Sequence, residues 1–318
     1  MTNKTKYREF CNKEQGLPIF LKDWWLDSVC DDKWDAIVIE RNGNIKAVMP
    51  YVVLKKPFIK ALGMPLLTQF LGPYIKYEDN LSYQKKLSFE NKIIFDILSF
   101  IPKVNSFSIN CSYEMENWLP FFWNNFKQTT RYSYLIDDLN DLDQVFSNFS
   151  SSYRNKIRKS KRLLEVKKDL NIEEFYDLNT MVFNRQNLTP PYSKEFIIKH
   201  DEVLRQNKAR EIFYASDEDG KIHSALYLTW DKKSSYLHMI GENPDLRKSS
   251  AGILLVWEAI QYTKNTLELN KFDFEGSMIS SVEQVRRSFG AVQKPYFNIY
   301  KNESIYLKTK EYFKSLLK

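Results

Sequence analysis

KFDFEGSMISSVEQVRRSFGAVQKPYFNIY, residues 271–300, is the stretch that decides the fold. Residues 272–274 alternate between apolar and polar side chains as a short strand does. Gly276-Ser277 then supplies the backbone freedom of a tight turn. Residues 280–289 have apolar side chains at helical spacing, followed by a glycine that is typical of a helix end. A second strand is expected over residues 295–300.

A carboxylate, a small polar turn and two guanidinium groups lie close together in this stretch: Glu275, Ser277, Arg286 and Arg287. Such a collection at the end of a strand is typical of a ligand site. A solvated, charged helix after an ordinary turn explains the same charges, and it is the more common arrangement. The residues alone leave both interpretations open.

The composition indicates a folded, basic protein that is large enough for two domains. The chain has 318 residues, of which 43% are hydrophobic and 15% aromatic, and this excludes a disordered protein. The net charge is +7 and the pI is about 9.0. These values suit an anionic partner such as a CoA pyrophosphate, a nucleotide-linked precursor, tRNA or a membrane surface.

The cysteines and histidines indicate neither a disulfide framework nor a metal site. The cysteines are odd in number without CxxC spacing, and we expect them to be buried apolar residues: Cys11, Cys30 and Cys111. The histidines show no ligand spacing: His200, His223 and His238. The N-terminus lacks the apolar core of a signal peptide, and no apolar run approaches the roughly 20 residues of a membrane span. We therefore predict a cytoplasmic protein with no integral membrane segment and no metal.

The order of expected elements is repeated in the two halves of the chain. Each half has a helix, a hairpin, a strand, a helix, a strand, a helix and a final strand, with the hairpins about Asn42-Gly43 and Asp219-Gly220. Coincidence between two generic halves is the alternative. The repetition predicts an α+β fold with a duplicated unit. We expect an N-terminal domain over 1–137 and a C-terminal domain over 138–318, which carries the active site. Each domain would have a mixed, mostly antiparallel sheet flanked by helices.

Two basic segments lie near the start of the second half. Residues 150–168 are expected to form a helix that begins at serines and carries three arginines on one face: Arg154, Arg158 and Arg162. Such a run is usually a solvated face or a nonspecific polyanion patch. Residues 180–189 are expected to form a second helix, which contains Arg185.

These segments resemble those of the FemAB-type transferases, a tandem branch of the GNAT acyltransferase superfamily. That family closes with an acidic-Gly-Ser corner, a basic FK-x-G-F-G-like element and a final strand. Here the second element reads VRRSFG, residues 285–290, with Arg286 where the family usually has lysine and serine in place of the first glycine. Residues 154–160 are similar to its R-x-x-I-R-K-A element, and residues 180–185 to its T-x-x-x-x-R pattern. The resemblance is clear over residues 146–300.

Residues 247–252, RKSSAG, resemble the Q/R-x-x-G-x-G/A loop of GNAT enzymes. Those enzymes hold the CoA pyrophosphate on a helix N-terminus, whose amides and dipole favour anions. The first and last residues fit, while serine stands at the middle glycine. The resemblance implies five cofactor-binding residues: Arg247, Lys248, Ser249, Ser250 and Gly252. A helix start with ordinary serine caps is the alternative.

The resemblance implies an N-acyltransferase that acts on an amine of a cell-envelope or polysaccharide precursor. The acceptor would be a small molecule or a lipid-linked or nucleotide-linked amine. The loop favours acyl-CoA as donor, whereas the FemAB-like tandem and the pI favour aminoacyl-tRNA. The long helical arm that tRNA-dependent members often carry is not evident in the sequence. A non-catalytic, polyanion-binding GNAT-like protein is a further alternative.

Candidate site residues follow from this implication. In a GNAT-like sheet, the strands at 236–241 and 272–274 part, and the acyl group lies in the gap. The candidate bases are Glu275, Glu242 and His238. Tyr236 and Tyr192 are candidate proton donors to the leaving group. His238 in an apolar strand equally suits a packed histidine. An ion pair with Arg286 or Arg287 would instead make Glu275 a structural residue. The implied substrate-binding residues are Arg154, Arg158, Arg185, Tyr192, Ser277 and Arg286.

Overall fold

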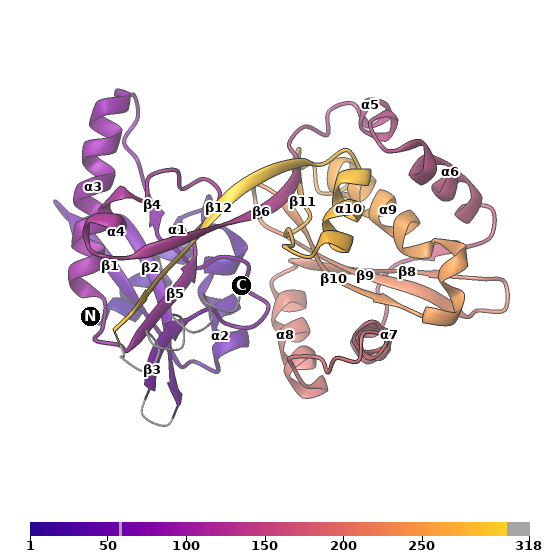
Figure 1. The fold of residues 1–318 in the computed structure, drawn as a ribbon, viewed down its shortest axis with the longest axis horizontal. Coiled ribbons are helices and arrows are strands. Elements are labelled where there is room, and N and C mark those ends of the chain that lie inside the picture. The colour runs from indigo at the N-terminus through magenta and orange to yellow at the C-terminus, as the bar shows by residue number, and fades with distance from the viewer. Residues whose placement is uncertain (57–58, 304–318) are drawn as a thin grey trace, which may run out of the picture. The chain divides into compact units, whose positions relative to one another are not determined.

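The computed structural model describes residues 1–56 and 59–303, and its contacts divide the chain into two compact units (Figure 1). Among the described residues, unit 1 comprises residues 1–131 and 295–303, and unit 2 comprises Tyr132–Lys294. This division differs from the predicted boundary after residue 137 in two ways. The seam lies a few residues earlier, and the last described strand belongs mostly to unit 1.

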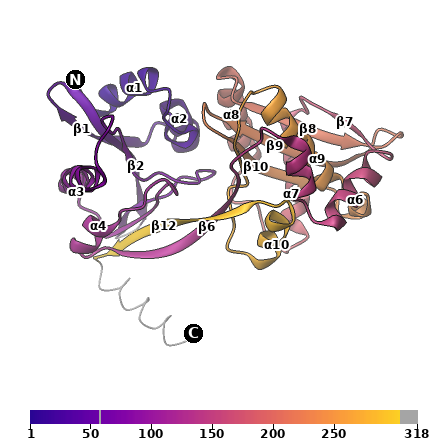
Figure 2. The same cartoon turned by 90° about the horizontal axis from the view of Figure 1, so that it is seen from above.

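Unit 1 is a mostly antiparallel sheet with helices on both faces. Its strands lie in the spatial order β1 (Trp34–Arg41), β2 (Asn44–Lys56), β3 (Ile59–Gly63), β5 (Ser106–Asn110) and β12 (Val292–Asn302), with the short β4 (Tyr74–Ile75) beside β2. The pair β3 and β5 is parallel. One face carries α1 (Asn3–Lys13) and α2 (Asp23–Cys30), joined by a 3₁₀ turn (Ile19–Leu21), and α3 (Tyr83–Phe100) covers the other (Figure 2). The short α4 (Leu119–Trp123) precedes the strand β6.

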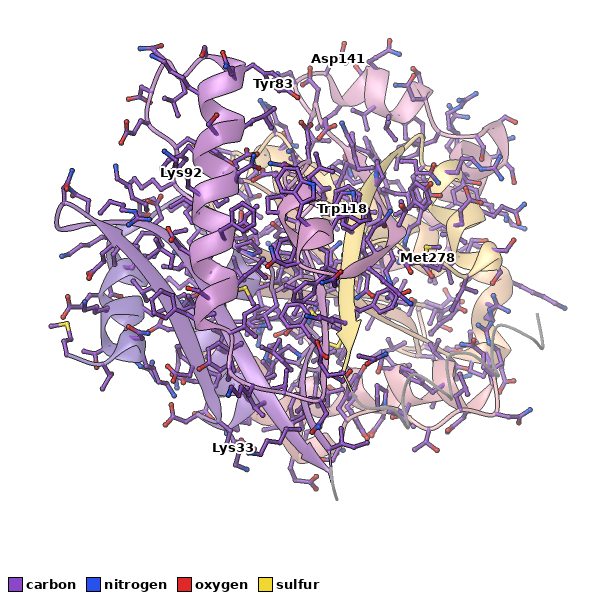
Figure 3. The ribbon with its side chains drawn as sticks, turned by 60° about the vertical axis from the view of Figure 1, so that its left-hand side comes forward. Lys33, Tyr83, Lys92, Trp118, Asp141 and Met278 are labelled. Carbon is purple, nitrogen blue, oxygen red and sulfur yellow. The ribbon has the colours of Figure 1, made fainter. Side chains whose placement is uncertain are left out.

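The core of unit 1 explains why α3 packs where it does. Ile37 and Ile39 of β1 are buried on one face of the strand, and Ile93, Ile94 and Ile97 of α3 are buried in the same cluster. Residues at this spacing share one side of a helix. The opposite side of α3 carries exposed residues such as Lys92 (Figure 3).

Unit 2 has the same layered construction. Its strands lie in the order β6 (Lys127–Ile136), β11 (Phe272–Asp273), β10 (Ser235–Glu242), β9 (Ile222–Trp230), β8 (Arg210–Ser216) and β7 (Glu165–Lys167). The pair β10 and β11 is parallel. The helices α7 (Ile172–Asn184) and α8 (Lys194–Gln206) cover one face of the sheet, and α9 (Ala251–Asn265) covers the other, together with α5 (Leu142–Ser147), α6 (Ser151–Ser160) and α10 (Ser280–Ser288) (Figure 1).

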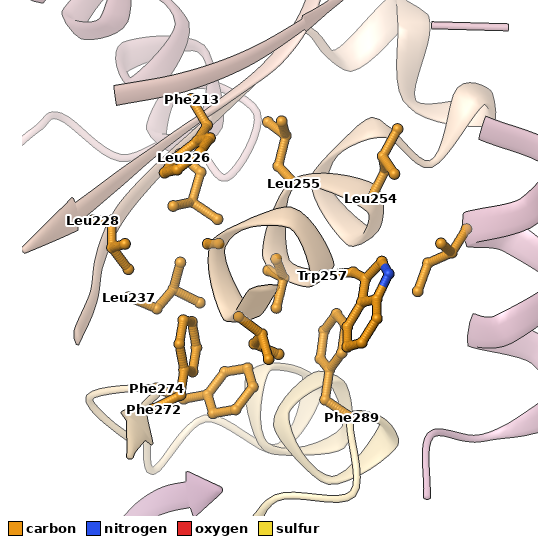
Figure 4. Close-up of a cluster of buried hydrophobic side chains, with 14 of the residues drawn as sticks. Phe213, Leu226, Leu228, Leu237, Leu254, Leu255, Trp257, Phe272, Phe274 and Phe289 are labelled. Carbon is orange, nitrogen blue, oxygen red and sulfur yellow. The ribbon is translucent and has the colours of Figure 1, made fainter. Parts of the chain in front are cut away.

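The core of unit 2 is built around α9 (Figure 4). Leu254, Leu255 and Trp257 of this helix are buried against strand residues such as Leu226 and Leu237. Three phenylalanines from the stretch at residues 271–300 complete the cluster: Phe272, Phe274 and Phe289. The apolar residues of that stretch therefore fix β11 and α10 to the sheet, and they position the polar residues between them.

The predicted duplication is confirmed, and the final strands of the two repeats are exchanged. The order β1-β2-β3-α3-β5-α4-β6 recurs as β8-β9-β10-α9-β11-α10-β12. However, β6 of the first repeat pairs with β11 of the second, and β12 of the second pairs with β5 of the first. This exchange is the reason why the contact-based units differ from the sequence halves.

Two of the predicted basic helices end earlier than expected. The helix expected over residues 150–168 ends at Ser160, because the amides of Leu163 and Leu164 turn back to its carbonyl, and β7 follows. Arg162 therefore lies outside that helix. The helix expected at 180–189 ends at Asn184, so Arg185 follows it directly. Within the described ranges, no helix is long and apolar enough to cross a membrane.

Candidate functional site

The strands β10 and β11 pair over only two residues before they part. Ser235 lies opposite Phe272, and Tyr236 lies opposite Asp273. Just beyond, the register of β10 against β9 shifts between Leu237 and Met239, so that His238 occupies a bulge. A bulge redirects a side chain and leaves its residue outside the regular ladder. The parting strands expected from the resemblance are thus present, with His238 at the point where they diverge.

His238 and Glu275 form a hydrogen-bonded pair at this point. His238 Nδ1 lies 2.8 Å from Glu275 Oε1, and the two side chains are 1% and 16% exposed. A carboxylate at Nδ1 holds the neutral ring in the tautomer that carries its proton there, which leaves Nε2 as the basic nitrogen. The pair can therefore accept a proton at Nε2 while Glu275 stabilises the imidazolium that results.

Glu275 sits in a strained backbone corner. Its φ is +54°, and that of Gly276 is +60°. A Cβ at Gly276 would lie 2.1 Å from the carbonyl oxygen of Tyr132, so only glycine fits. Left-handed backbone costs roughly 1–2 kcal/mol for a residue with a side chain, and such strain is often found at functional sites.

Asp273 stabilises this corner through hydrogen bonds. It was not among the site residues predicted from the sequence. Its Oδ1 accepts hydrogen bonds from the Glu275 amide at 2.8 Å and from Ser133 Oγ at 2.6 Å. Asp273 is fully buried, and burial raises the pKa of its carboxyl to about 7. The sequence feature that could have identified Asp273 is a charged residue between two phenylalanines of a short core strand.

Arg286 places a positive charge near these carboxylates. Burial lowers the pKa of its guanidinium to about 10, and attraction by Glu275 and Asp273 opposes that shift. Its Nε has no hydrogen-bond partner among the described residues, and the guanidinium lies 5.6 Å from the Phe274 ring. The alternative prediction, an ion pair from Glu275 to Arg286 or Arg287, is wrong for the described residues: Glu275 pairs with His238, and Arg287 with Glu283 at 3.1 Å.

The loop at residues 247–252 has left-handed backbone at the position where the family pattern has its middle glycine. A 3₁₀ turn, η2 (Pro244–Ser249), leads into α9, and Ser250 between them has a φ of +59°. This is the left-handed region that glycine occupies most easily, and Ser250 stands at the middle glycine of the family pattern. The serine therefore keeps the loop geometry at a cost in backbone strain.

The structure brings Arg185 and Arg247 together at Glu242. Arg247 Nε lies 2.5 Å from Glu242 Oε2, and Arg185 Nη1 lies 3.7 Å from the same oxygen. Glu242, a candidate base in the sequence analysis, is thus the shared partner of two arginines. Two predicted site residues from distant segments meet here, 62 positions apart in the chain (247 minus 185).

The two candidate tyrosines make other contacts. The Tyr236 hydroxyl donates to Asp231 Oδ2 at 2.8 Å. The Tyr192 hydroxyl donates to Asn179 Oδ1 at 2.8 Å, and burial raises its pKa above the usual value. Both phenols are therefore engaged by neighbouring side chains in this structure.

Three further predicted residues also have local partners. Arg154 donates from Nη1 to the carbonyl oxygens of Ser147 and Phe149, where it stabilises the end of α5. Arg158 is exposed, and its guanidinium lies 5.6 Å from the Phe146 ring. Ser277 Oγ accepts from the Ile279 amide at 3.1 Å. The proposal that Arg154, Arg158, Arg247 and Arg286 border one cleft remains a prediction.

A buried polar layer lies behind His238, and the sequence analysis missed it because α8 was not predicted. The rings of His200 and Tyr227 lie 5.8 and 5.9 Å from the His238 ring. Burial lowers the pKa of His200. Tyr227 donates to Asp201 at 2.8 Å, and Asp201 pairs with Arg210 at 3.0 Å. These contacts hold the wall against which His238 packs.

Neither the cysteines nor the acidic residues suggest a metal site in the part of the chain that the structure describes. That part contains no group of three or more His, Cys, Asp or Glu that could hold a metal ion. The three cysteines are buried free thiols, and burial raises the pKa of each to about 12.

Residues 147–278 match the family model of the acetyltransferase (GNAT) domain. No curated protein shows significant sequence similarity to the chain. The site described above lies within or next to the matched residues. The match therefore agrees with the resemblance to GNAT enzymes inferred from the sequence.

Solved structures show that the fold extends over nearly the whole chain. A crystal structure of FemX is similar with a TM-score of 0.69 and 11% identity, and the match covers 93% of this chain and 96% of that one. The structure of L-PGS from Bacillus licheniformis has a TM-score of 0.55 and 11% identity, with 96% and 93% covered. The C-terminal domain of a predicted lysylphosphatidylglycerol synthetase from Agrobacterium fabrum has a TM-score of 0.52 and 9% identity, with 94% and 91% covered.

The family match and the parting strands of unit 2 agree with each other. Residues 147–278 therefore match a GNAT-type acetyltransferase domain, and the chain shares the fold of FemX over nearly its whole length.

Proposed function

We propose that unit 2 transfers an acyl group from acyl-CoA to an amine of a cell-envelope or polysaccharide precursor, with the His238–Glu275 pair as proton acceptor. The observation that carries this proposal is the position of the pair. It lies where β10 and β11 part, and this is where the resemblance to GNAT enzymes puts the reacting acyl group. The family match over residues 147–278 supports acyl transfer as the class of reaction.

The chemistry assigned to the pair is proton transfer. The amine attacks the thioester carbonyl, a C–N bond forms and the C–S bond breaks. His238 Nε2 takes the proton that the amine loses and returns it to the departing thiolate, so the ring is neutral again after each turnover. Glu275 stabilises the transient imidazolium through Nδ1. General acid–base catalysis of this kind contributes typically 10²–10⁴-fold to a rate.

Arg286 supports an acceptor that carries negative charge. Its guanidinium is partly buried, and Nε has no hydrogen-bond partner among the described residues. A buried N–H without a hydrogen-bond acceptor is costly, and a ligand oxygen at this Nε would offset that cost. Cell-envelope precursors with phosphate or carboxylate groups would satisfy this requirement.

Aminoacyl-tRNA is the second candidate donor, and one observation favours it. Arg247, the residue expected to contact a CoA pyrophosphate, is already paired with Glu242 at 2.5 Å. The net charge of +7 also suits a nucleic acid. For either donor we propose a cytoplasmic location, and the three free cysteines suit a reducing compartment.

The test is a Glu275→Gln variant, measured by thiol release from acetyl-CoA in the presence of amino sugars and nucleotide-linked or lipid-linked amines. We expect turnover to fall by about 10²-fold or more, with the affinity for donor little changed. The matched control is Glu283→Gln, which removes the same charge from the ion pair with Arg287. A His238→Ala change should give a similar loss, and the double variant should be no worse than either single one.

Two results would contradict the proposal. A Glu275→Gln protein that melts early yet keeps normal turnover when folded would make Glu275 a structural residue. An absence of transfer from both acetyl-CoA and aminoacyl-tRNA to every amine, combined with tight binding of polyanions, would favour the non-catalytic alternative.

A further inference from the structure

Glu242 is the last residue of β10, and its side chain lies beside the first turn of α9. Its Oε2 is shared by Arg247 at 2.5 Å and Arg185 at 3.7 Å. A Cβ added to Gly252, in the first turn of α9, would lie 3.8 Å from the other carboxylate oxygen, Oε1. The carboxylate therefore faces both the two guanidinium groups and the first turn of a helix.

An anionic ligand bound at this position would make the same contacts as the Glu242 carboxylate. Guanidinium groups and the positive end of a helix dipole are the usual partners of phosphate oxygens. Here a side chain of the protein supplies the anion. The side chain of Glu242 is 23% exposed, so it is partly shielded from the solvent that would weaken its field.

We propose that Glu242 is an internal counter-anion that determines donor specificity, because it competes with a pyrophosphate for Arg247 and Arg185. The inference rests on the proposed function only in taking residues 247–252 as the loop that receives the donor. A donor with a pyrophosphate must displace Glu242 from Arg247 or bind beside a second negative charge. A donor that places no phosphate at this loop does not encounter this repulsion.

The experiment compares CoA binding to the wild-type chain and to a Glu242→Gln variant by isothermal titration calorimetry. Glutamine keeps the size of the side chain but removes the charge, which frees both arginines. We expect CoA to bind about tenfold more tightly to the variant, with most of the gain lost in high salt because charge contacts are screened. Inorganic pyrophosphate should show the same direction of change.

The matched control is Glu258→Gln. Glu258 also lies on α9, its side chain is 26% exposed, and it pairs with Lys161 at 2.8 Å. The same charge is thus removed from the same helix, away from its N-terminus. CoA affinity should stay at the wild-type value in this control. Adding Arg247→Gln to Glu242→Gln should abolish the gain, because the freed guanidinium is its source.

The inference is overturned if Glu242→Gln binds CoA no more tightly than the wild type or the Glu258→Gln control, or if CoA binds to none of these proteins. The proposed function fails by a different measurement, when Glu275→Gln leaves turnover intact. The two failures are therefore distinguishable.

Discussion

The two repeats follow the same path, but the second places a hydrogen-bonded histidine and carboxylate where its parallel strands part. In the first repeat, Leu62 lies opposite Phe107, as Ser235 lies opposite Phe272 in the second. Beyond that pair, Met64 Sδ accepts a hydrogen bond from the Asn110 amide at 3.2 Å. A thioether thus occupies the start of the gap, where the second repeat has His238 and Glu275.

The shared fold thus supplies the gap between the strands, whereas individual side chains supply the chemistry. Only the second repeat combines left-handed backbone at Glu275 with a buried carboxylate at Asp273. In the first repeat, the residue that follows the core phenylalanine is the neutral Ser108. Features that lower stability are therefore concentrated beside the candidate site, as is common where a structure serves a reaction.

The largest expected effect is a loss of stability when alanine replaces the glycine beside the candidate site, compared with the same change at a glycine of the first hairpin. Gly276→Ala should lower the free energy of unfolding by more than about 4 kcal/mol, because the new Cβ meets the Tyr132 carbonyl oxygen and the backbone is left-handed. Gly43→Ala, at a φ of +73° in open space, should cost only about 1 kcal/mol. Urea denaturation of both variants measures the difference. Equal losses would show that the corner at Gly276 is no more constrained than a surface turn.

A smaller effect should appear in the pH dependence of stability. The pKa of Asp273 is about 7 when folded, against 3.8 for a free carboxyl, so the unfolded chain releases its proton first. Stability should therefore fall as pH rises from about 4 to 7, by about 4 kcal/mol from this group alone.

An Asp273→Asn variant should lack this loss, since the amide keeps an acceptor oxygen but does not ionise. Its free energy of unfolding should rise relative to the wild type between pH 5 and 8. Ser108→Ala, the matching change in the first repeat, should run parallel to the wild type. If the free energy of unfolding of Asp273→Asn also ran parallel to that of the wild type across this pH range, the buried acid would not be a source of instability in the second repeat.

The smallest expected effect concerns the loop before α9. Ser250→Gly relieves left-handed backbone but gives the unfolded chain more freedom, so the net stabilisation should be below about 1 kcal/mol. Thermal unfolding would detect it as a small increase in Tm. A decrease would mean that the serine side chain contributes more than its backbone costs.

Local patterns in the sequence predicted much of the fold. The turn at Asn42-Gly43 has both residues at positive φ, as a type I′ hairpin requires. At Asp219-Gly220 only the glycine has positive φ, and the Gly220 amide donates to the Asp217 carbonyl oxygen at 3.0 Å, so this hairpin has a longer turn. The helix start expected at the loop of residues 247–252 is found at Ala251, where α9 begins. The final strand was expected, but its partner was not, since alternation identifies a strand without saying which strand it joins.

The site was predicted less completely, because its contacts are not local. Glu275 and His238 were both candidates, yet 37 residues separate them and no spacing rule links them. No sequence pattern predicts the bulge that redirects the His238 side chain. No pattern predicts the burial that raises the pKa of Asp273 either. The resemblance identified the segments, whereas only the folded chain shows which side chains meet.

The exchanged final strands have a consequence for synthesis on the ribosome. The first repeat emerges with β5 complete, but the strand that pairs with its edge, β12, is made only after β7 to β11 have been made. Until then the nascent chain carries an open sheet edge, which is a common starting point for aggregation. The first repeat therefore reaches its full sheet only when the second repeat has been made through β12.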